Sequence, residues 1–257
     1  MSSEYQPGLT LITCTGGRPQ AFELCARFIG RRTYAGPFQW IIVDDVGDSP
    51  ASHWIDDQVE NGRVVTAVTP EPKWRPGQNT LARNLLAAIP HVRYDKVLFI
   101  EDDDFYPPDY CAMQCERLDS VAWISGDPMS RYYHVPSRRF RFMVNEGCAS
   151  LCQTGLRSEY LLVLENVLSS GSHFIDRDLW LAMARSRRDL SMAPHPVVGM
   201  KGLPGRAGIG IGHRPEMQPL QWSADPDGRV LREWIGEDAE LYEQFYATYP
   251  NNEPARV

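Results

Sequence analysis

The 257-residue chain has no apolar run near the roughly 18 residues that a membrane-spanning helix needs. Its first residues, MSSEYQPG, lack the basic stretch and apolar segment of a secretion signal. We therefore expect a cytoplasmic protein. The chain also lacks internal repeats and low-complexity linkers, so its length suits a single domain over 1–257.

Acidic residues outnumber basic residues in this chain. The chain carries 26 Lys and Arg against 33 Asp and Glu, a formal net charge of −7. This balance opposes general adhesion to nucleic acid or to an acidic membrane, although a local basic patch could override it.

Cysteine is present but not in a recognisable metal-binding arrangement. Without an export signal, the six Cys are expected to be reduced. The pairs Cys111-x3-Cys115 and Cys148-x3-Cys152 do not have the two-residue spacing of zinc knuckles. We expect buried thiols there rather than a metal site.

Strand and helix patterns alternate through the first half. Strands are expected at 9–13, 40–43, 63–68, 97–100 and 121–125, and helices at 19–29, 78–89 (capped by Asn79 or Thr80) and 108–118. This alternation favours an α/β fold with a mostly parallel central sheet flanked by helices.

The second half is less regular. Short antiparallel strands are expected at 132–135 and 139–144, helices at 156–168, 176–187 and 237–249, and a Gly/Pro-rich loop, either mobile or ligand-wrapping, at 195–215. We therefore divide the domain into a regular half, 1–126, and an irregular half, 127–257.

Acidic residues follow two of the expected strands. Asp44-Asp45 comes after one strand and the run Glu101–Asp104 after another. Since ligands bind beyond the carboxyl ends of parallel strands, the two groups should meet in one crevice. Repelling carboxylates are stable around a divalent cation, and oxygen ligands suit Mg²⁺ or Mn²⁺. The alternative is a solvated turn in which one Asp caps the next helix.

Four segments in order, LITCTGGRP, WIIVDDVGD, NTLARNLL and VLFIEDDDFYPPDYC, resemble the nucleotide-sugar half of GT-A glycosyltransferases, in particular family 2. The resemblance continues more weakly through SHFIDRDLWLAMAR and GIGIGHRP. It implies a GT-A (Rossmann-like) fold, with 1–126 binding the nucleotide sugar and 127–257 forming the acceptor-binding and catalytic half. The implied activity is metal-dependent sugar transfer, with inversion, from an expected UDP-sugar to the hydroxyl of a glycan, a small molecule or a modified DNA base.

The resemblance also implies roles for individual residues. Thr13, Thr15, Arg18 and Asp44 match positions that hold the nucleoside, and Arg83 matches a residue near the uracil or phosphates. The alternative for Asp44 is a simple turn after a strand, and for Arg83 a surface salt bridge on a helix.

The acidic run is similar to the Asp-x-Asp signature of these enzymes. We favour Asp103 as the principal metal ligand, with Asp102 toward the ribose and Asp104 near the metal; an Asp102-x-Asp104 register stays open. His213 resembles the C-terminal histidine that completes the metal shell, which would favour Mn²⁺ over Mg²⁺. Its alternative is an ordinary hydrogen-bonded loop histidine.

Asp176 in HFIDRDLW matches the catalytic base of inverting transfer, although Ile175 replaces the acid that often precedes it. A carboxylate there could deprotonate an acceptor hydroxyl, or it could only cap a helix. Asp178 is the second candidate for the base. Lys201 and Arg206 could contact the diphosphate, or could be solvated charges.

The stretch SRRFRF interleaves Arg138, Arg139 and Arg141 with Phe140 and Phe142. Arginines among aromatics suit a single-stranded nucleic acid, which keeps modified DNA open as an acceptor. The period of two favours instead an amphipathic strand with the phenylalanines inward and the arginines outward.

Two other classes share parts of this pattern. A nucleotidyltransferase would need a glycine-rich triphosphate loop with a nearby lysine after the first strand, and Gly16-Gly17-Arg18 is too short for one. A noncatalytic nucleotide-sugar-binding module would carry a similar pocket, so only activity separates it from an enzyme.

Overall fold

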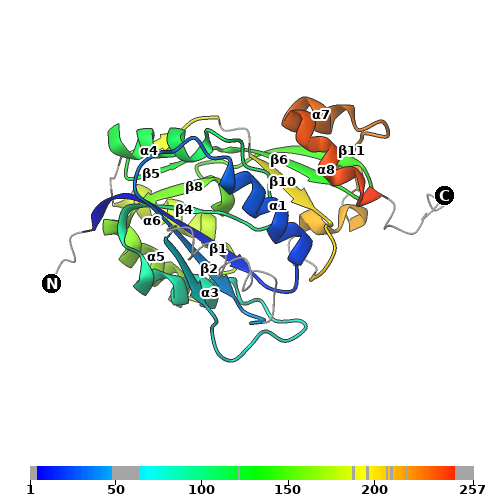
Figure 1. The fold of residues 1–257 in the computed structure, drawn as a ribbon. Helices are drawn as coiled ribbons and strands as arrows, with labels where there is room; N and C mark the ends of the chain where they lie inside the picture. Colours follow the sequence, from blue (N-terminus) through cyan, green and yellow to red (C-terminus); the bar gives the residue numbers. More distant parts are fainter. Residues whose placement is uncertain are drawn as a thin grey trace.

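The computed structural model describes residues 5–47, 64–120, 122–186, 189–194, 197–206, 208, 211–217 and 219–246. In these ranges the main sheet has the strand order β3-β2-β1-β4-β8-β5-β9 (Figure 1). Its strands are β1 (Gln6–Thr15), β2 (Phe38–Asp44), β3 (Val64–Val68), β4 (Tyr94–Phe99), β5 (Ile124–Gly126), β8 (Thr154–Arg157) and β9 (Leu190–Met192).

The sheet is mostly parallel, as the sequence predicts. Strand β1 pairs in parallel with β2 and β4, and β2 with β3, while β8 runs antiparallel to β4 and β5. The register places Thr15 opposite Asp44. Just beyond the end of β4, the amide of Ile100 still donates to the carbonyl of Ile12 in β1, at 2.9 Å. Both acidic segments therefore leave the sheet at the same edge.

Helices cover both faces of this sheet. They are α1 (Pro19–Gly30), α3 (Leu81–Ala88), α4 (Tyr110–Ser120), α5 (Leu161–Ser169) and α6 (Ile175–Arg185). Helices α3, α5 and α6 bury apolar side chains in one core cluster, and α1 and α4 bury theirs in a second, on the opposite face (Figure 1). None of the helices in the described ranges combines the length and apolarity that a membrane crossing requires.

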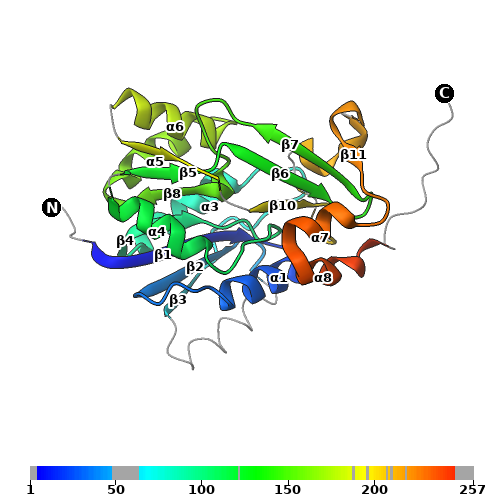
Figure 2. The ribbon, with the colours of Figure 1, turned by 90° about the horizontal axis from the view of Figure 1, so that it is seen from above.

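A smaller sheet with the order β10-β6-β7-β11 lies beside α1 (Figure 2). Its strands are β6 (Met129–His134), β7 (Arg139–Val144), β10 (Val198–Lys201) and β11 (Ser223–Ala224), and α7 (Arg229–Ile235) and α8 (Glu240–Glu243) lie against it. A third core cluster joins the two parts through Phe28 of α1, Tyr133 and Met200 of the sheet, and Leu231 of α7.

Short 3₁₀ helices connect several of these elements. They are η1 (Ile89–His91), η2 (Leu151–Gln153), η3 (Ser158–Tyr160), η4 (Ile211–His213), η5 (Pro215–Met217), η6 (Pro219–Gln221) and η7 (Gly236–Ala239).

Three expected elements differ in the structure. The helix expected at 156–168 begins only at Leu161, and its first residues belong to β8 and η3. The described part of the expected helix 237–249 contains η7 and α8 instead, and Gly236, at φ +62°, follows directly on α7. Residues 247–249 lie outside the described part. The Gly/Pro-rich segment contains strand β10. The boundary at 126 stays a prediction.

Strand β7 was predicted correctly as a strand, and the expected direction of its side chains holds only in part. Phe140 and Phe142 pack on Trp234 of α7, with ring centroids 5.7 and 5.0 Å away, and Phe142 is 52% exposed. Arg141 and Met143, on the other face, line the main pocket. The expected inward direction therefore holds for Phe140, which packs against the third core cluster. It fails for Phe142, which is largely exposed, and for Arg141, which faces the pocket.

Candidate functional site

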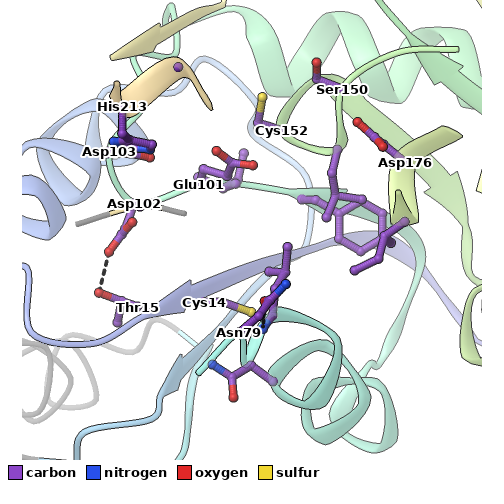
Figure 3. A pocket seen from close by; sticks show the side chains of 18 of the residues that line it. Cys14, Thr15, Asn79, Glu101, Asp102, Asp103, Ser150, Cys152, Asp176 and His213 are labelled. Atoms are coloured by element: carbon purple, nitrogen blue, oxygen red, sulfur yellow. Dashed lines mark hydrogen bonds and ion pairs between the residues drawn. The ribbon is translucent and has the colours of Figure 1, made fainter. Parts of the chain in front are cut away.

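A pocket of about 440 Å³ lies at the carboxyl ends of β1 and β4, next to the smaller sheet (Figure 3). Many of the predicted site residues line it. They are Thr15, Arg18, Asp102, Asp103, Asp176, Lys201, Arg206 and His213, together with Thr80, Asn84, Glu101, Tyr132, Arg141, Ser150 and Cys152. The chain therefore brings residues from both halves to one cavity.

Asp102 is held by the loop between β1 and α1. The hydroxyl of Thr15 donates to its Oδ2 at 2.6 Å, and the Nη2 of Arg18 lies 2.5 Å from its Oδ1 (Figure 3). Burial raises the pKa of Asp102 to about 6, although Arg18 acts in the opposite direction. Arg18 also donates to Asp103 at 3.0 Å, so its guanidinium bridges two acids.

Asp103 and His213 lie next to each other, with 3.7 Å between Oδ2 and Nε2 (Figure 3). Burial would raise the pKa of Asp103, but the charges of Lys201 and Arg18 lower it to about 2. Burial, followed by the charge of Lys201, lowers the pKa of His213 to about 4. At neutral pH the pair is therefore a carboxylate beside a neutral imidazole.

The glycine-rich segment makes room for this histidine. A Cβ at Gly208 would lie 2.1 Å from Nε2 of His213, so a larger residue there would displace the ring.

Lys201 is buried inside the acidic run rather than solvated. Its Nζ lies 2.9 Å from Asp104, 3.5 Å from Glu101 and 3.7 Å from Asp103. Burial lowers the pKa of Lys201, but these carboxylates outweigh it and raise the pKa well above its usual value. The protein thus carries its own cation among the acids.

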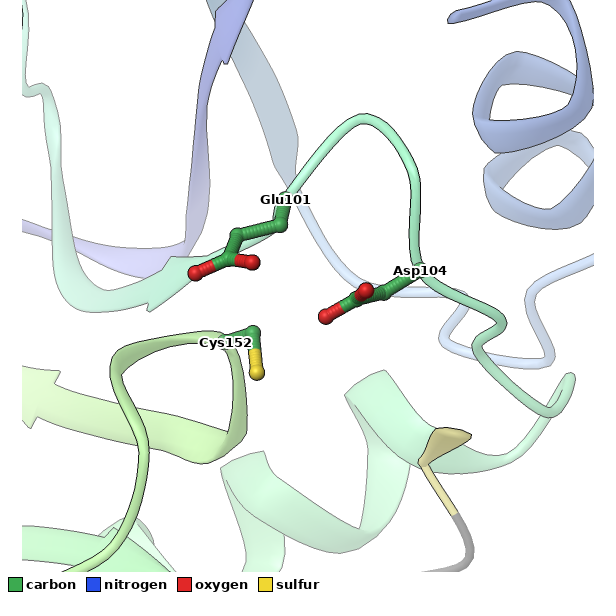
Figure 4. Close-up of side chains that lie close together, drawn as sticks. All are labelled: Glu101, Asp104 and Cys152. Atoms are coloured by element: carbon green, nitrogen blue, oxygen red, sulfur yellow. The ribbon is translucent and has the colours of Figure 1, made fainter. Parts of the chain in front are cut away.

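Asp104 belongs to a different cluster from Asp103. Its Oδ1 accepts hydrogen bonds from Lys201 and from the amide of Met200, at 2.9 and 3.1 Å. Ligand atoms of Glu101, Asp104 and Cys152 lie within 4.8 Å of one another (Figure 4). Burial raises the pKa of the Cys152 thiol well above its usual range, so it stays protonated there. All six cysteines are free thiols.

Of the two acids at the end of β2, Asp44 and Asp45, only Asp45 is hydrogen-bonded to residues that line the pocket. The wholly buried Asp45 accepts hydrogen bonds from the hydroxyl of Thr80, from Asn84 at 2.9 Å and from Arg206 at 2.8 Å. These bonds overcome the effect of burial and lower the pKa of Asp45. The carboxylate of Asp44 instead accepts hydrogen bonds from the backbone amides of residues 46 and 47. This is the simple turn that was the alternative to a nucleoside-binding role for Asp44.

Arg206 closes the pocket from the smaller-sheet side. Its guanidinium lies 4.3 Å from the ring centroid of Trp74, and its amide donates to the carbonyl of Gly17 at 3.0 Å. Gly205 has φ +103°, and a Cβ there would lie 2.4 Å from that same carbonyl. Only glycine allows the segment to approach the β1–α1 loop so closely.

Three of the residues predicted to bind the nucleotide do not line the cavity. Thr13 accepts a hydrogen bond from the indole of Trp40 at 2.9 Å, in the core, and Asp44 closes its turn. Arg83 donates to the carbonyl of Pro72 and lies 3.7 Å from Asp45, so it supports the pocket wall from behind. In this conformation Asp45 replaces Asp44 as the acid connected to the site.

Asp176 lines the pocket from the first turn of α6, on the side away from Asp103 (Figure 3). Its Oδ1 accepts a hydrogen bond from the amide of Arg177 at 2.8 Å, and burial raises its pKa. The N-cap position is Phe174, so Asp176 is not the cap. Asp178, the second candidate for the base, instead accepts from Ser172 at 2.7 Å and does not line the pocket.

Comparison with known proteins identifies the fold. Neither a scan of protein-family models nor a search of the curated proteins found a match. Among solved structures, a mannosyltransferase from Pyrobaculum calidifontis in complex with GDP-Man and Mn²⁺ is similar, with a TM-score of 0.54, 14% identity, and coverage of 95% of this chain and 74% of that one. The S. aureus protein TarS is similar over 75% of this chain, with a TM-score of 0.53 and 13% identity.

The likeness to TarS extends to its residues 1–349 in complex with UDP, again with a TM-score of 0.53 and 13% identity. The chain spans 36% of the longer TarS chain and 60% of the shorter one. These likenesses confirm the predicted GT-A glycosyltransferase fold.

Proposed function

We propose that this chain transfers a sugar from a nucleotide sugar to the hydroxyl of an acceptor, with inversion at the anomeric carbon. The observation that supports this most is the composition of one pocket in a GT-A fold. The Asp103–His213 pair and the Arg18 guanidinium lie on one side of the cavity, and Asp176 lies on the other. Such a pocket has cationic groups for a diphosphate and a carboxylate for an acceptor hydroxyl.

The residues fit a divalent cation at Asp103 and His213. One is ionised and the other is a neutral imidazole at neutral pH, so neither has to lose a proton to bind a metal. A mixed oxygen and nitrogen set suits Mn²⁺ better than Mg²⁺. When bound, the ion would neutralise diphosphate charge.

The cluster of Glu101, Asp104 and Cys152 fits this role less well. The ammonium of Lys201 already pairs with both of its carboxylates, and its thiol is protonated. Asp104 therefore acts indirectly in our proposal, by holding Lys201 next to the Asp103 carboxylate.

The residues on the acceptor side perform the proton transfer in our proposal. Asp176 takes the proton of the acceptor hydroxyl as its oxygen forms a bond to the anomeric carbon. The bond from that carbon to the diphosphate oxygen breaks, and the nucleoside diphosphate leaves. The raised pKa of Asp176 makes it a stronger base than an exposed Asp.

The donor is proposed to be UDP-linked, with Mn²⁺ as its cation. Structures similar to this chain were solved with UDP and with GDP-Man, so both bases belong in the test. Thr15, Arg18 and Asp102 would contact the ribose and diphosphate end, and the Asp45 network would border the nucleoside end.

Thermal unfolding with a panel of UDP- and GDP-sugars, each with and without Mn²⁺, tests this proposal. We expect at least one nucleotide sugar to raise the melting temperature, more with Mn²⁺ than without it, because a ligand that binds only the folded state stabilises it. The absence of any shift across the panel would reject the proposal.

A further inference from the structure

A chain of hydrogen-bonded hydroxyl groups leads from the pocket wall into the core. Tyr132 and Ser150 both line the pocket, and 3.1 Å separates the hydroxyl oxygen of Tyr132 from Oγ of Ser150. Oγ of Ser150 lies 2.9 Å from Oγ of Ser130, which in turn donates to Oε1 of Gln153 at 2.9 Å. Ser130 and Gln153 are each only 2% exposed, so the inner end of this chain is closed to solvent.

The direction of these hydrogen bonds is fixed at the buried end. The side-chain amide of Gln153 donates to the carbonyl of Met129 at 3.2 Å, and because a carbonyl only accepts, Oε1 faces Ser130. Each hydroxyl has a single proton to donate. Ser130 gives its proton to Gln153, so Ser150 must donate to Ser130. Ser150 then has no proton left for Tyr132, and the Tyr132 hydroxyl therefore donates to Ser150.

The two serines have little capacity left for a ligand, whereas the tyrosine oxygen keeps some. Nδ2 of Asn145 donates to Oγ of Ser130 at 2.9 Å and lies 3.4 Å from Oγ of Ser150, so both serine oxygens accept as well as donate. Within the described part of the chain, the Tyr132 hydroxyl forms a hydrogen bond only with Ser150. Its oxygen therefore has lone pairs for a ligand but no proton to offer.

Tyr132 also lies close to the proposed diphosphate site. Its ring centroid is 5.9 Å from Nζ of Lys201, and that ammonium lies 3.7 Å from Asp103, the metal ligand of our proposal. Strand β10 fixes the ring, because a Cβ at Gly199 would lie 2.6 Å from it. In a nucleotide sugar the transferred sugar is bonded directly to the diphosphate, so the sugar is the part of the donor that reaches this wall.

We infer that Tyr132 accepts a hydrogen bond from a hydroxyl of the transferred sugar. This inference rests on the proposed function. A sugar with a hydroxyl at that position pairs with the tyrosine oxygen, whereas a substituent that only accepts would face its lone pairs. Tyr132 thus selects the sugar through the direction of a hydrogen bond.

Calorimetric titration with fluorinated nucleotide sugars tests this direction. The probes are UDP-glucose, UDP-N-acetylglucosamine and GDP-mannose with Mn²⁺, together with analogues in which each sugar hydroxyl is replaced in turn by hydrogen or by fluorine. Carbon-bound fluorine cannot donate a hydrogen bond. For a donor that binds, we expect one position at which both analogues bind about tenfold more weakly than the parent. In Tyr132→Phe the parent should bind as weakly as these two analogues.

Tyr133→Phe is the matched control. Tyr133 is the next residue of β6, but its hydroxyl donates to Asp225 at 3.1 Å and it does not line the pocket, so this variant should still discriminate among the probes. The inference is overturned if the fluorinated analogue binds like the parent wherever deoxygenation weakens binding. It is also overturned if Tyr132→Phe discriminates as the wild type does, or if deoxygenation has no effect at any position. If none of the parent nucleotide sugars binds, the proposed function fails instead.

Discussion

The guanidinium of Arg206 lies 2.8 Å from the carboxylate of Asp45, although 161 residues separate them in the sequence. This ion pair joins the segment after β10 to the end of β2 and closes one end of the pocket. Because Asp45 is wholly buried and also accepts from Thr80 and Asn84, the pair is part of the fold as well as of the site.

Replacing Asp45 should therefore destabilise the protein more than replacing its neighbour. Asp45→Ala leaves three donors without their acceptor and is expected to lower the free energy of unfolding by about 3 kcal/mol. Asp44→Ala removes two turn hydrogen bonds and should cost about 1 kcal/mol. Chemical denaturation of both variants measures the difference.

The pH dependence of this effect has a definite sign. The folded pKa of Asp45 is lowered, so its contribution is present above the unfolded pKa and is lost as the pH falls through the folded pKa. The loss of unfolding free energy caused by Asp45→Ala should therefore become smaller at acidic pH. Equal losses in the Asp44 and Asp45 variants at neutral pH would contradict the assignment.

Lys201 is predicted to be essential for the stability of the acidic run. Lys201→Met leaves Glu101, Asp103 and Asp104 without this counter-charge and should cost about 3–5 kcal/mol near neutral pH. The deficit should shrink as the pH falls, because carboxylates whose folded pKa is raised favour the folded state when protonated. Denaturation at pH 5 and at pH 8 measures both effects.

Lys96→Met is the matched control for this experiment. Lys96 is buried to a similar degree, but its partners Asp95 and Asp119 are 41% and 62% exposed. Such partners stay solvated when the lysine is removed, so the cost should be about 1 kcal/mol or less. A loss in Lys201→Met no larger than this would show that the buried cation is dispensable.

His213 should contribute directly to metal affinity. His213→Ala is expected to weaken Mn²⁺ binding by about tenfold or more, because the site loses its imidazole ligand. Asp103→Asn should weaken it further, since the amide carries no charge. Binding can be followed through the effect of Mn²⁺ on water proton relaxation. His91→Ala, at an exposed position outside the pocket, should leave the affinity unchanged.

Asp176 should lower the stability of the protein at neutral pH. Its folded pKa is raised, so the group favours the folded state below the unfolded pKa, and that contribution is lost as the pH rises through the folded pKa. Asp176→Asn removes the cost of burying the ionised carboxylate. Its melting temperature should exceed that of the wild type near pH 7, with the gap closing in acid. A lower melting temperature near pH 7 would contradict this.

Much of the fold follows from local pattern. Strands β1, β2 and β4 each contain a short apolar stretch, and α1 presents its apolar residues at helical spacing. The sequence therefore predicts a parallel α/β sheet. Strand β8 was missed because its four residues run into the apolar residues of α5, and the pattern merges with a helix. Strand β10 was missed because it contains Gly199. A glycine is needed at this position, because a Cβ would clash with the ring of Tyr132 on the neighbouring strand.

The site was less predictable, because its contacts join distant segments. The acids of 101–104 were visible as a cluster, but Lys201, which pairs with three of them, lies 97 residues beyond Asp104. In the same way, the choice of Asp45 over Asp44 depends on Arg206. The direction of Arg141 depends on Trp234, which covers the opposite face of β7. No local pattern contains these partners.

Replacing Asp176 distinguishes a glycosyltransferase from a noncatalytic nucleotide-sugar-binding module. This replacement therefore tests the central claim most directly. The measurement compares donor affinity with the rate of nucleoside diphosphate release, using the nucleotide sugar that stabilises the wild type most and Mn²⁺. For Asp176→Asn we predict unchanged donor affinity and a release rate about 100-fold or more below that of the wild type. Asp178→Asn, which lies outside the pocket, should release at the wild-type rate. An unaltered rate in Asp176→Asn, or no release by the wild type, would contradict the account.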